Sequence, residues 1–355
     1  ASSRLSNAER IGQGAANSPE LHGLRSAYGL ARVLVGAMRV LVTGASGFVG
    51  RALAKRLVAR GDVVVRGGFR TLPVSPESLG IEVGLMGELG PRTDWESVLG
   101  GVDLIVHCAA REHVMREAAV DPIGLYRQSN TLGTIALGRA AAACGCRRFV
   151  FVSSVKVNGE ETRPGFPYTE EDLPAPVDPY GLSKLEAEDG LRELARETGM
   201  EVVIVRPPLV YGWGVKANFA VMMRWLERGV PLPLGGVRDN FRSVIALDNL
   251  VDFLETCLFH PAASNQVFLV SDGEDLSTAE LLSRTARAMG TQARLIPVPA
   301  GFLRIAGNLL GRSELVRRLC GSLQVDISRA RRLLGWMPPI GIDEGLRRAT
   351  HGEAE

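Results

Sequence analysis

A glycine-rich turn between a predicted strand and a predicted helix constrains this chain more than any other feature. Residues 40–42 form a short apolar run typical of a buried parallel strand. Gly44, Gly47 and Gly50 follow at three-residue intervals, and apolar residues then recur at helical spacing through residue 58. Backbone N–H groups at such a helix N-terminus attract an anion, and the missing side chains let it approach closely. The stretch predicts a phosphate-binding βα unit, although such glycines also occur where they only close a tight connection.

Composition places the chain among globular proteins. It has 355 residues, of which 46% are hydrophobic and 23% charged, enough for one large domain or two moderate ones. The net charge of +2 and the lack of a long basic run argue against nucleic acid as a partner. The cysteines are scattered and odd in number, which predicts reduced thiols, no metal site and a cytoplasmic setting. They are Cys108, Cys144, Cys146, Cys257 and Cys320. No apolar run is long enough to span a bilayer.

The first 37 residues differ from the rest of the chain. Ser, Ala and Gly separate four arginines and two glutamates. A secretory signal is not expected, because there is no basic segment followed by an apolar core. Met38 leads directly into the first predicted strand. We therefore expect residues 1–37 to be a disordered, dispensable extension and Met38 to be the natural start.

Strands and helices alternate after the glycine turn. Apolar runs at 61–70, 104–106 and 149–154 are separated by helical patterns, which predicts right-handed βαβ units. The predicted fold class is a doubly wound parallel α/β sheet of the Rossmann type. Small residues, Ala109 and Ala110, follow the 104–106 strand, where open α/β sheets bind ligands across the strand ends.

The end of the second predicted strand bears on cofactor choice. In dinucleotide-binding folds an acidic residue there binds the ribose of NAD, whereas arginine suits the extra phosphate of NADP. This strand end has no Asp or Glu but carries Arg66 and Arg70, and Arg70 is the better placed of the two. The sequence favours NADP and leaves NAD open.

Tyr180 and Lys184 supply a candidate acid/base pair. Four residues apart on a predicted helix, they share one face. A neighbouring ammonium stabilises a phenolate and lowers the tyrosine pKa towards working pH. Tyr180 is then suited to move a proton on or off a sugar or alcohol oxygen.

Taken together, these motifs resemble an extended short-chain dehydrogenase/reductase of the nucleotide-sugar epimerase/dehydratase family. The resemblance covers Met38 to about Arg348. It rests on Thr43-Gly-x-x-Gly-x-x-Gly50, His107-Cys-Ala-Ala110, Ser153-Ser154, Tyr180-x-x-x-Lys184 and Arg206-Pro-Pro-Leu-Val-Tyr-Gly212.

The resemblance implies roles for particular residues. Ser154, Tyr180 and Lys184 would be catalytic, with Ser154 hydrogen-bonding the reacting sugar oxygen. Cofactor binding would involve Tyr180 and Lys184 together with Gly44, Ser46, Gly47, Phe48, Val49, Gly50, Arg70, Ala109, Ala110 and Pro207. The substrate would contact Ser154, Asn218 and Arg242.

It also implies a domain organisation. A cofactor-binding domain would span 38–205, and a smaller C-terminal α/β substrate-binding domain would span most of 206–355, with the chain crossing between them. Prolines and glycines cluster after Arg206, so ordered loops are expected to dominate there. Family members often dimerise through two helices, here those containing Asn130 and Tyr180, so a homodimer is expected.

The reaction is narrowed by the residues after Ser154. Sugar 4,6-dehydratases have an Asp-Glu pair there, whereas this chain has Val155-Lys156, so dehydration is not expected. We interpret Lys156 as a surface lysine at a loop start. The sequence favours reduction of a 4-keto nucleotide sugar of the UDP-4-keto-6-deoxy-N-acetylhexosamine type, because NADP(H) is readily exchanged. It resembles reductases that form UDP-N-acetylquinovosamine for bacterial surface polysaccharides.

Two alternatives remain open. One is 4-epimerisation of UDP-glucose or UDP-N-acetylglucosamine. The other is an NADP-sensing regulator without catalysis, which is disfavoured because Ser154, Tyr180 and Lys184 are all retained. The sugar and its stereochemistry at carbon 4 are not defined by these motifs.

The first prediction concerns Tyr180. Tyr180→Phe removes the proton donor and little else, so cofactor binding should persist while turnover falls by about 10²-fold or more. Fluorescence titration of the reduced cofactor and steady-state kinetics measure the two effects. Near-normal turnover would remove Tyr180 from the mechanism.

Overall fold

Seven parallel strands form the central sheet of the computed structural model, which describes residues 37–73, 80–111, 121–215 and 218–351. Residues Arg39–Glu355 form one compact unit, which carries the fold. Apart from residue 37, the extension predicted at 1–37 lies outside the described residues. In the described part of the chain no helix is both long and apolar enough to cross a membrane.

The strand order of this sheet is β3-β2-β1-β4-β5-β6-β9. The β2–β3, β1–β4, β4–β5, β5–β6 and β6–β9 ladders are parallel. The order reverses between β1 and β4, which makes this the switch point where doubly wound sheets bind ligands. The strands are β1 (Met38–Thr43), β2 (Val63–Phe69), β3 (Glu82–Leu85), β4 (Leu104–His107), β5 (Arg148–Val152), β6 (Glu201–Arg206) and β9 (Val267–Leu269).

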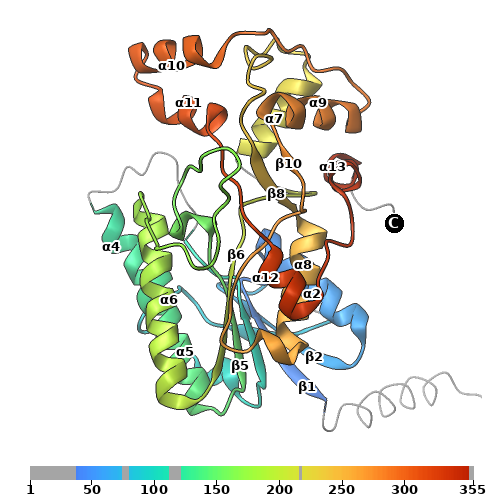
Figure 1. The fold of residues 1–355 in the computed structure, drawn as a ribbon. Helices are drawn as coiled ribbons and strands as arrows, with labels where there is room; N and C mark the ends of the chain where they lie inside the picture. The colour runs from blue at the N-terminus through green and yellow to red at the C-terminus, as the bar shows by residue number, and fades with distance from the viewer. Residues whose placement is uncertain (1–36, 74–79, 112–120, 216–217, 352–355) are drawn as a thin grey trace, which may run out of the picture. The chain divides into compact units, whose positions relative to one another are not determined.

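Helices cover both faces of this sheet (Figure 1). On one face α2 (Phe48–Arg60) and α8 (Leu247–Phe259) pack against each other and against the strands. On the other lie α3 (Glu96–Leu99), α4 (Pro122–Tyr126), the π-helical turn η2 (Arg127–Leu132), α5 (Gly133–Ala143) and α6 (Pro179–Thr198). The inner strands β1, β4, β5 and β6 are mostly buried, which explains their continuous apolar runs. The predicted Rossmann-type α/β fold is confirmed.

A smaller three-stranded sheet lies beyond β6, in the order β10-β8-β7. Its strands are β7 (Leu209–Tyr211), β8 (Arg242–Ala246) and β10 (Asp275–Leu276). Around it lie α7 (Asn218–Glu227), α9 (Thr278–Ala288) and α13 (Ile342–His351). The C-terminal half also contains the 3-10 helix η4 (Pro261–Ala263), α10 (Ala300–Leu309), α11 (Ser313–Cys320) and α12 (Ser328–Leu334).

The expectation that loops dominate after Arg206 is wrong for most of this half. Residues 228–241 are largely irregular, but helices prevail from Leu247 onwards because amphipathic segments find different partners. α9 and α13 pack on the small sheet, α10 and α11 pack on a cluster that includes α7 and α9, and α12 packs on β9. The chain also returns to the large sheet through α8 and β9 before leaving it again. The division at residue 205 stays a prediction.

A buried ion pair joins α6 to the end of β6. Both side chains are almost completely buried, and Arg206 donates from Nε and Nη2 to the two carboxylate oxygens of Glu188 at 2.9 and 2.6 Å. Ser153 donates to the same carboxylate at 2.6 Å, and Asn158 accepts from Arg206 Nη1 at 3.0 Å. The charges are therefore paired and hydrogen-bonded, as burial requires.

The second prediction follows from this pair. Arg206→Met should remove the buried partner of the Glu188 carboxylate and leave it only the half-exposed Arg192, at 2.8 Å, so the free energy of unfolding should fall by about 3 kcal/mol. Arg206→Met combined with Glu188→Met should lose much less than the two single variants added together. Denaturant unfolding of the four proteins measures this coupling, and strict additivity would show that the pair is not coupled.

Candidate active site

A cavity of about 650 Å³ opens at the carboxyl ends of the strands. All the residues expected to contact the cofactor line it: Gly44, Ser46, Gly47, Phe48, Val49, Gly50, Arg70, Ala109, Ala110, Tyr180, Lys184 and Pro207. Ser154 lines it as well. The glycine turn (residues 44–50) and the helix that carries Tyr180 and Lys184, called the Tyr-Lys helix below, therefore line the same cavity.

The glycine turn is shaped by close backbone approaches. Gly44 has φ +68°, and a Cβ there would lie 2.9 Å from the Ala109 nitrogen. A Cβ on Gly50 would lie 2.2 Å from the Gly44 oxygen, so α2 packs directly on the turn. Gly47 is the N-cap of α2 and no side chain caps this helix. These features fit the pyrophosphate of a dinucleotide, because the helix N–H groups remain available to an anion.

His107 fixes the neighbouring strand end. Its ring lies between the hydroxyls of Thr43 and Thr134, at 2.7 and 3.0 Å, and is completely buried. Thr43 Oγ1 also accepts from the Ala109 nitrogen at 3.2 Å. Burial lowers the pKa of His107 to about 3, so the ring is neutral at working pH. It ties β1, β4 and α5 together beneath Ala109.

The two arginines of the second strand have different partners. Arg66 points away from the cavity, donating to Glu82 and to the carbonyls of Val98 and Gly100. Arg70 lines the cavity, with its side chain 69% exposed and Nη1 3.8 Å from Glu88. Only Arg70 of this pair therefore lies where it could meet a ribose phosphate.

The Tyr-Lys helix is held at its first turn. Asp178 caps α6 by accepting from the Gly181 nitrogen at 2.6 Å, and Pro179 occupies the first helical turn. Lys184 is buried, donates to the Val152 carbonyl at 2.9 Å and lies 4.6 Å from the Phe151 ring centroid. Its Nζ is 5.9 Å from the Tyr180 ring centroid. Burial lowers the pKa of Lys184 to about 8.

The adjacent serines have distinct environments. Ser153 is buried and donates to Glu188, so it belongs to the buried ion pair. Ser154 is less buried, and its hydroxyl accepts from the Lys156 nitrogen at 3.2 Å as the N-cap of the short helix η3 (Val155–Val157). This arrangement favours Ser154 as the hydroxyl that contacts substrate.

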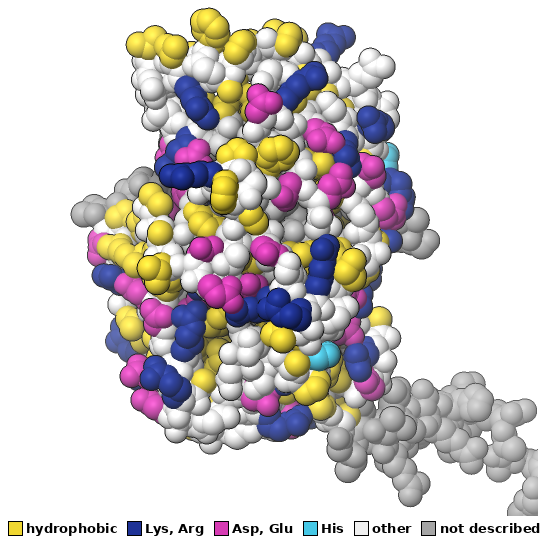
Figure 2. Space-filling model, viewed as in Figure 1, with side chains coloured by type: hydrophobic (Ala, Val, Ile, Leu, Met, Phe, Trp, Pro, Cys, Tyr) yellow, Lys and Arg dark blue, Asp and Glu magenta, His cyan; other side chains and the backbone are white. Residues whose placement is uncertain are grey.

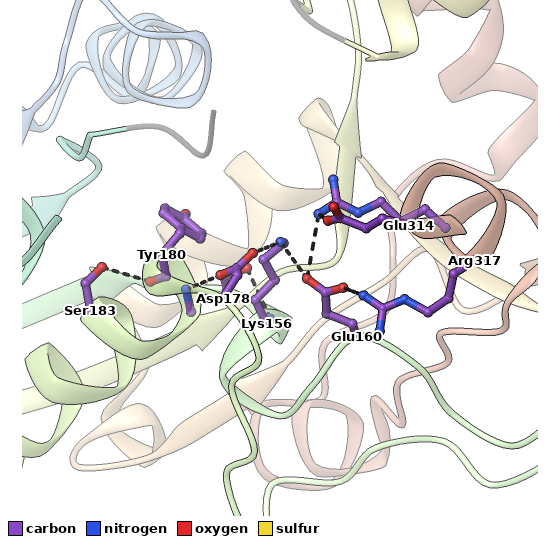
Figure 3. Close-up of polar contacts among 10 residues, drawn as sticks. Lys156, Glu160, Asp178, Tyr180, Ser183, Glu314 and Arg317 are labelled. Carbon is purple, nitrogen blue, oxygen red and sulfur yellow. Dashed lines mark hydrogen bonds and ion pairs between the residues drawn. The ribbon is translucent and has the colours of Figure 1, made fainter. Parts of the chain in front are cut away.

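Lys156 corrects the sequence interpretation. Instead of being a surface lysine at a loop start, it lies in η3 with its side chain only 22% exposed. Its ammonium binds the Asp178 carboxylate and also Glu160, at 3.0 Å (Figure 3). The two carboxylates hold it in place, and neither was recognised as its partner from the sequence.

Lys156 therefore joins two catalytic elements. Its backbone nitrogen contacts Ser154, and its side chain contacts the residue that caps the Tyr180 helix. A Cβ on Gly181 would lie 2.8 Å from the Lys156 carbonyl oxygen, so η3 packs tightly against the first turn of α6. Glu160 continues the contact to Arg317 on α11, at 2.6 Å.

Of the three expected substrate residues, Ser154 lines the cavity and Arg242 does not. Arg242 begins β8 and donates from Nη1 to the carbonyls of Arg318 and Gly321, at 2.6 and 3.1 Å. Burial lowers the pKa of its guanidinium. Asn218 is the first residue of α7, but its side chain is outside the described part of the structure. Both substrate assignments stay predictions.

Three supporting residues were not assigned a role from the sequence. Asn130, in η2, accepts from the Arg111 nitrogen at 2.8 Å and donates to Ser183 Oγ at 3.2 Å. Glu188 and Lys156 are the other two. For Glu188 a signal existed, since it continues the four-residue spacing of Tyr180 and Lys184. Among the described residues no group of three or more His, Cys, Asp or Glu could hold a metal ion.

Known proteins share this sequence pattern and fold. The family model described as the NAD dependent epimerase/dehydratase family matches residues 40–271. A Vibrio cholerae protein named UDP-glucose 4-epimerase is 47% identical over 88% of this chain and 94% of its own length. A Pseudomonas aeruginosa GDP-6-deoxy-D-mannose reductase is 29% identical over 87% of this chain and 95% of its own.

The fold is also found among solved structures. A UDP-glucuronic acid 4-epimerase from Bacillus cereus, in complex with NAD, superposes with a TM-score of 0.71. The alignment covers 88% of this chain and 96% of that one, at 22% identity. At this identity the comparison supports the architecture alone.

The third prediction tests the Lys156 contacts. Lys156→Met should remove the cation that Asp178 and Glu160 share and loosen the first turn of α6, although Glu160 keeps its contact with Arg317. We expect hydride transfer to slow by about tenfold while KM changes little, because the reacting groups lose alignment and the cavity is intact. Stopped-flow absorbance of the reduced nicotinamide measures the rate.

Two controls separate alignment from general damage. Lys156→Arg keeps the cation and should recover most of the rate, whereas Lys55→Met, at an exposed position on α2, should match the parent protein. An unchanged rate in Lys156→Met would show that Asp178 caps the helix adequately alone.

Proposed function

The chain belongs to the NAD dependent epimerase/dehydratase family, and on that basis we propose that it is a UDP-sugar 4-epimerase of the UDP-glucose or UDP-N-acetylglucosamine type. The observation that carries this choice is the 47% identity to the Vibrio cholerae UDP-glucose 4-epimerase over nearly the full length of both chains. The cavity supports it, since a dinucleotide cradle and a Ser-Tyr-Lys group line the same space.

Ser154, Tyr180 and Lys184 have different roles in the proposed reaction at carbon 4 of the sugar. When bound, NAD or NADP supplies a nicotinamide that takes up a hydride from carbon 4 and gives it back. Tyr180 takes the proton of the carbon 4 hydroxyl during oxidation and returns it during reduction. Ser154 hydrogen-bonds the same sugar oxygen and orients it. Lys184 supplies the positive charge that stabilises the tyrosinate and binds the nicotinamide ribose.

Reduction of a 4-keto nucleotide sugar is the second candidate. The observation favouring it is Arg70, which lines the cavity at a strand end that lacks an acidic residue. An arginine there supports NADP(H), and a cofactor that exchanges freely is consumed stoichiometrically in a reductase. The substrate would be a UDP-4-keto-6-deoxy-N-acetylhexosamine, as in surface polysaccharide synthesis.

We further propose that the enzyme works in the cytoplasm, where nucleotide sugars and nicotinamide cofactors are available. A homodimer through the helices containing Asn130 and Tyr180 also remains a proposal. The domain division at residue 205 is proposed as a functional one, with 206–355 supplying most substrate contacts.

The fourth prediction separates the two reactions. The enzyme is offered UDP-glucose and UDP-N-acetylglucosamine without a reductant, and separately the 4-keto-6-deoxy UDP-N-acetyl sugar with NADPH. An epimerase interconverts the first pair with their 4-epimers, seen by NMR, with no net change in cofactor. A reductase consumes NADPH in proportion to the keto sugar. If the enzyme is inactive in both assays, both candidate functions are contradicted.

Cofactor choice is measured with the same protein. If Arg70 binds the extra phosphate, Arg70→Ser weakens NADPH binding by about tenfold and leaves NADH binding unchanged, because charge-assisted hydrogen bonds are lost. Arg139→Ser, at an exposed position on α5, is the matched control. Equal affinity of the parent protein for both cofactors would dismiss the argument for NADP.

A further inference from the structure

Helix α10 presents an apolar stripe to solvent. Phe302, Ile305 and Leu309 are spaced three and four residues apart and share one face of the helix. Their exposures are 67%, 60% and 83%, and Leu310 directly after the helix is 76% exposed. Figure 2 shows hydrophobic side chains gathered along the same edge where Figure 1 places α10.

The opposite face of the helix already attaches it to the fold. Leu303 packs against the buried cluster that includes Leu226 and Leu282. A Cβ on Gly307 would lie 2.5 Å from Val316 Cγ2, so α10 rests closely on α11. The outward stripe is therefore not needed to hold α10 in place, and a solvent face would ordinarily be polar.

The charges near the stripe have one sign. Residues 293–312 contain Arg294, Arg304 and Arg312 and no aspartate or glutamate. All three arginines are exposed. The nearest acidic residue along the chain, Glu314, is paired with Arg318 on α11. An apolar stripe bordered by arginines is suited to the interface of an anionic lipid bilayer, where apolar side chains enter the acyl boundary and guanidinium groups stay among headgroups.

The size of the stripe favours lipid over a protein partner. Ten residues of helix extend over roughly 15 Å, and four side chains cover far less than the ~800 Å² per partner that a stable protein interface needs. An interfacial helix needs no such area, because each inserted side chain adds to a weak and reversible attachment.

We propose that α10 docks this protein onto an anionic membrane surface. The helix lies parallel to the bilayer, with Phe302, Ile305 and Leu309 inserted and Arg304 and Arg312 near lipid phosphates. This attachment is independent of the proposed sugar chemistry, since none of these residues lines the cavity.

The fifth prediction is tested by vesicle sedimentation of the full chain. The protein should sediment with phosphatidylcholine vesicles that contain phosphatidylglycerol, less so in high salt, and not with phosphatidylcholine alone. Phe302→Ser with Leu309→Ser should reduce binding by about tenfold or more. Arg304→Gln with Arg312→Gln should reduce it as well and remove its salt dependence.

Matched controls keep the test sharp. Phe166→Ser with Leu173→Ser changes two other exposed apolar side chains, 73% and 88% exposed, and should bind as the parent does. Turnover of sugar in vesicle-free solution should be unchanged in the α10 variants. A failure of the membrane proposal can therefore be distinguished from a failure of the proposed enzymatic function. No binding to the anionic vesicles, or equal binding by the α10 variants, would overturn the proposal. So would a concentration-dependent dimer, seen by gel filtration, that the α10 variants abolish.

Discussion

The Glu188 carboxylate is the contact on which the rest of the site depends. It is fully buried on α6 and forms ion pairs with Arg206 at the end of β6 and with Arg192 one turn further along α6. Ser153 donates to it, which fixes the chain directly before Ser154. Because unpaired buried charge is costly, the two strand ends and the Tyr-Lys helix are held in one arrangement. The catalytic groups are thus aligned by a contact that itself lies beneath the cavity.

A second polar connection runs along the surface side of the same elements. Lys156 binds Asp178 at the first turn of α6 and Glu160, which in turn binds Arg317 on α11. Figure 3 shows these side chains pointing towards one another from three separate segments. The buried contact of Glu188 holds α6 on the Lys184 side of the Tyr-Lys pair. The contact of Lys156 with Asp178 holds α6 on the Tyr180 side. Together they relate α6 to both the large sheet and the C-terminal helices.

Local sequence patterns predicted individual strands and helices. The contacts between side chains that hold the site together depend on long-range pairing and were not predicted. The apolar run, glycine spacing and Tyr-Lys interval are contained within single elements, so β1, α2 and α6 could be predicted. Arg206 and Glu188 meet only because β6 lies beside β5 and α6 packs across them. The same holds for Lys156 and Asp178, 22 residues apart. Proline and glycine content misled the prediction after Arg206, because tertiary packing on neighbouring helices and on both sheets stabilises the helices there.

Lys184 is a neighbour of Tyr180 whose charge can change near neutral pH. Burial lowers the pKa of His107 to about 3 and raises that of the Cys108 thiol to about 12, so both stay neutral. Lys184, with a pKa of about 8, remains mostly protonated at pH 7. The carbonyl of Val152 and the Phe151 ring hold its ammonium in place. Of these three groups, only Lys184 places a cation beside the phenol. A rise in pH from 7 towards 8 and above therefore deprotonates Lys184 and removes the positive charge that stabilises the Tyr180 tyrosinate. The acid/base chemistry of Tyr180 is in this way coupled to the protonation state of Lys184.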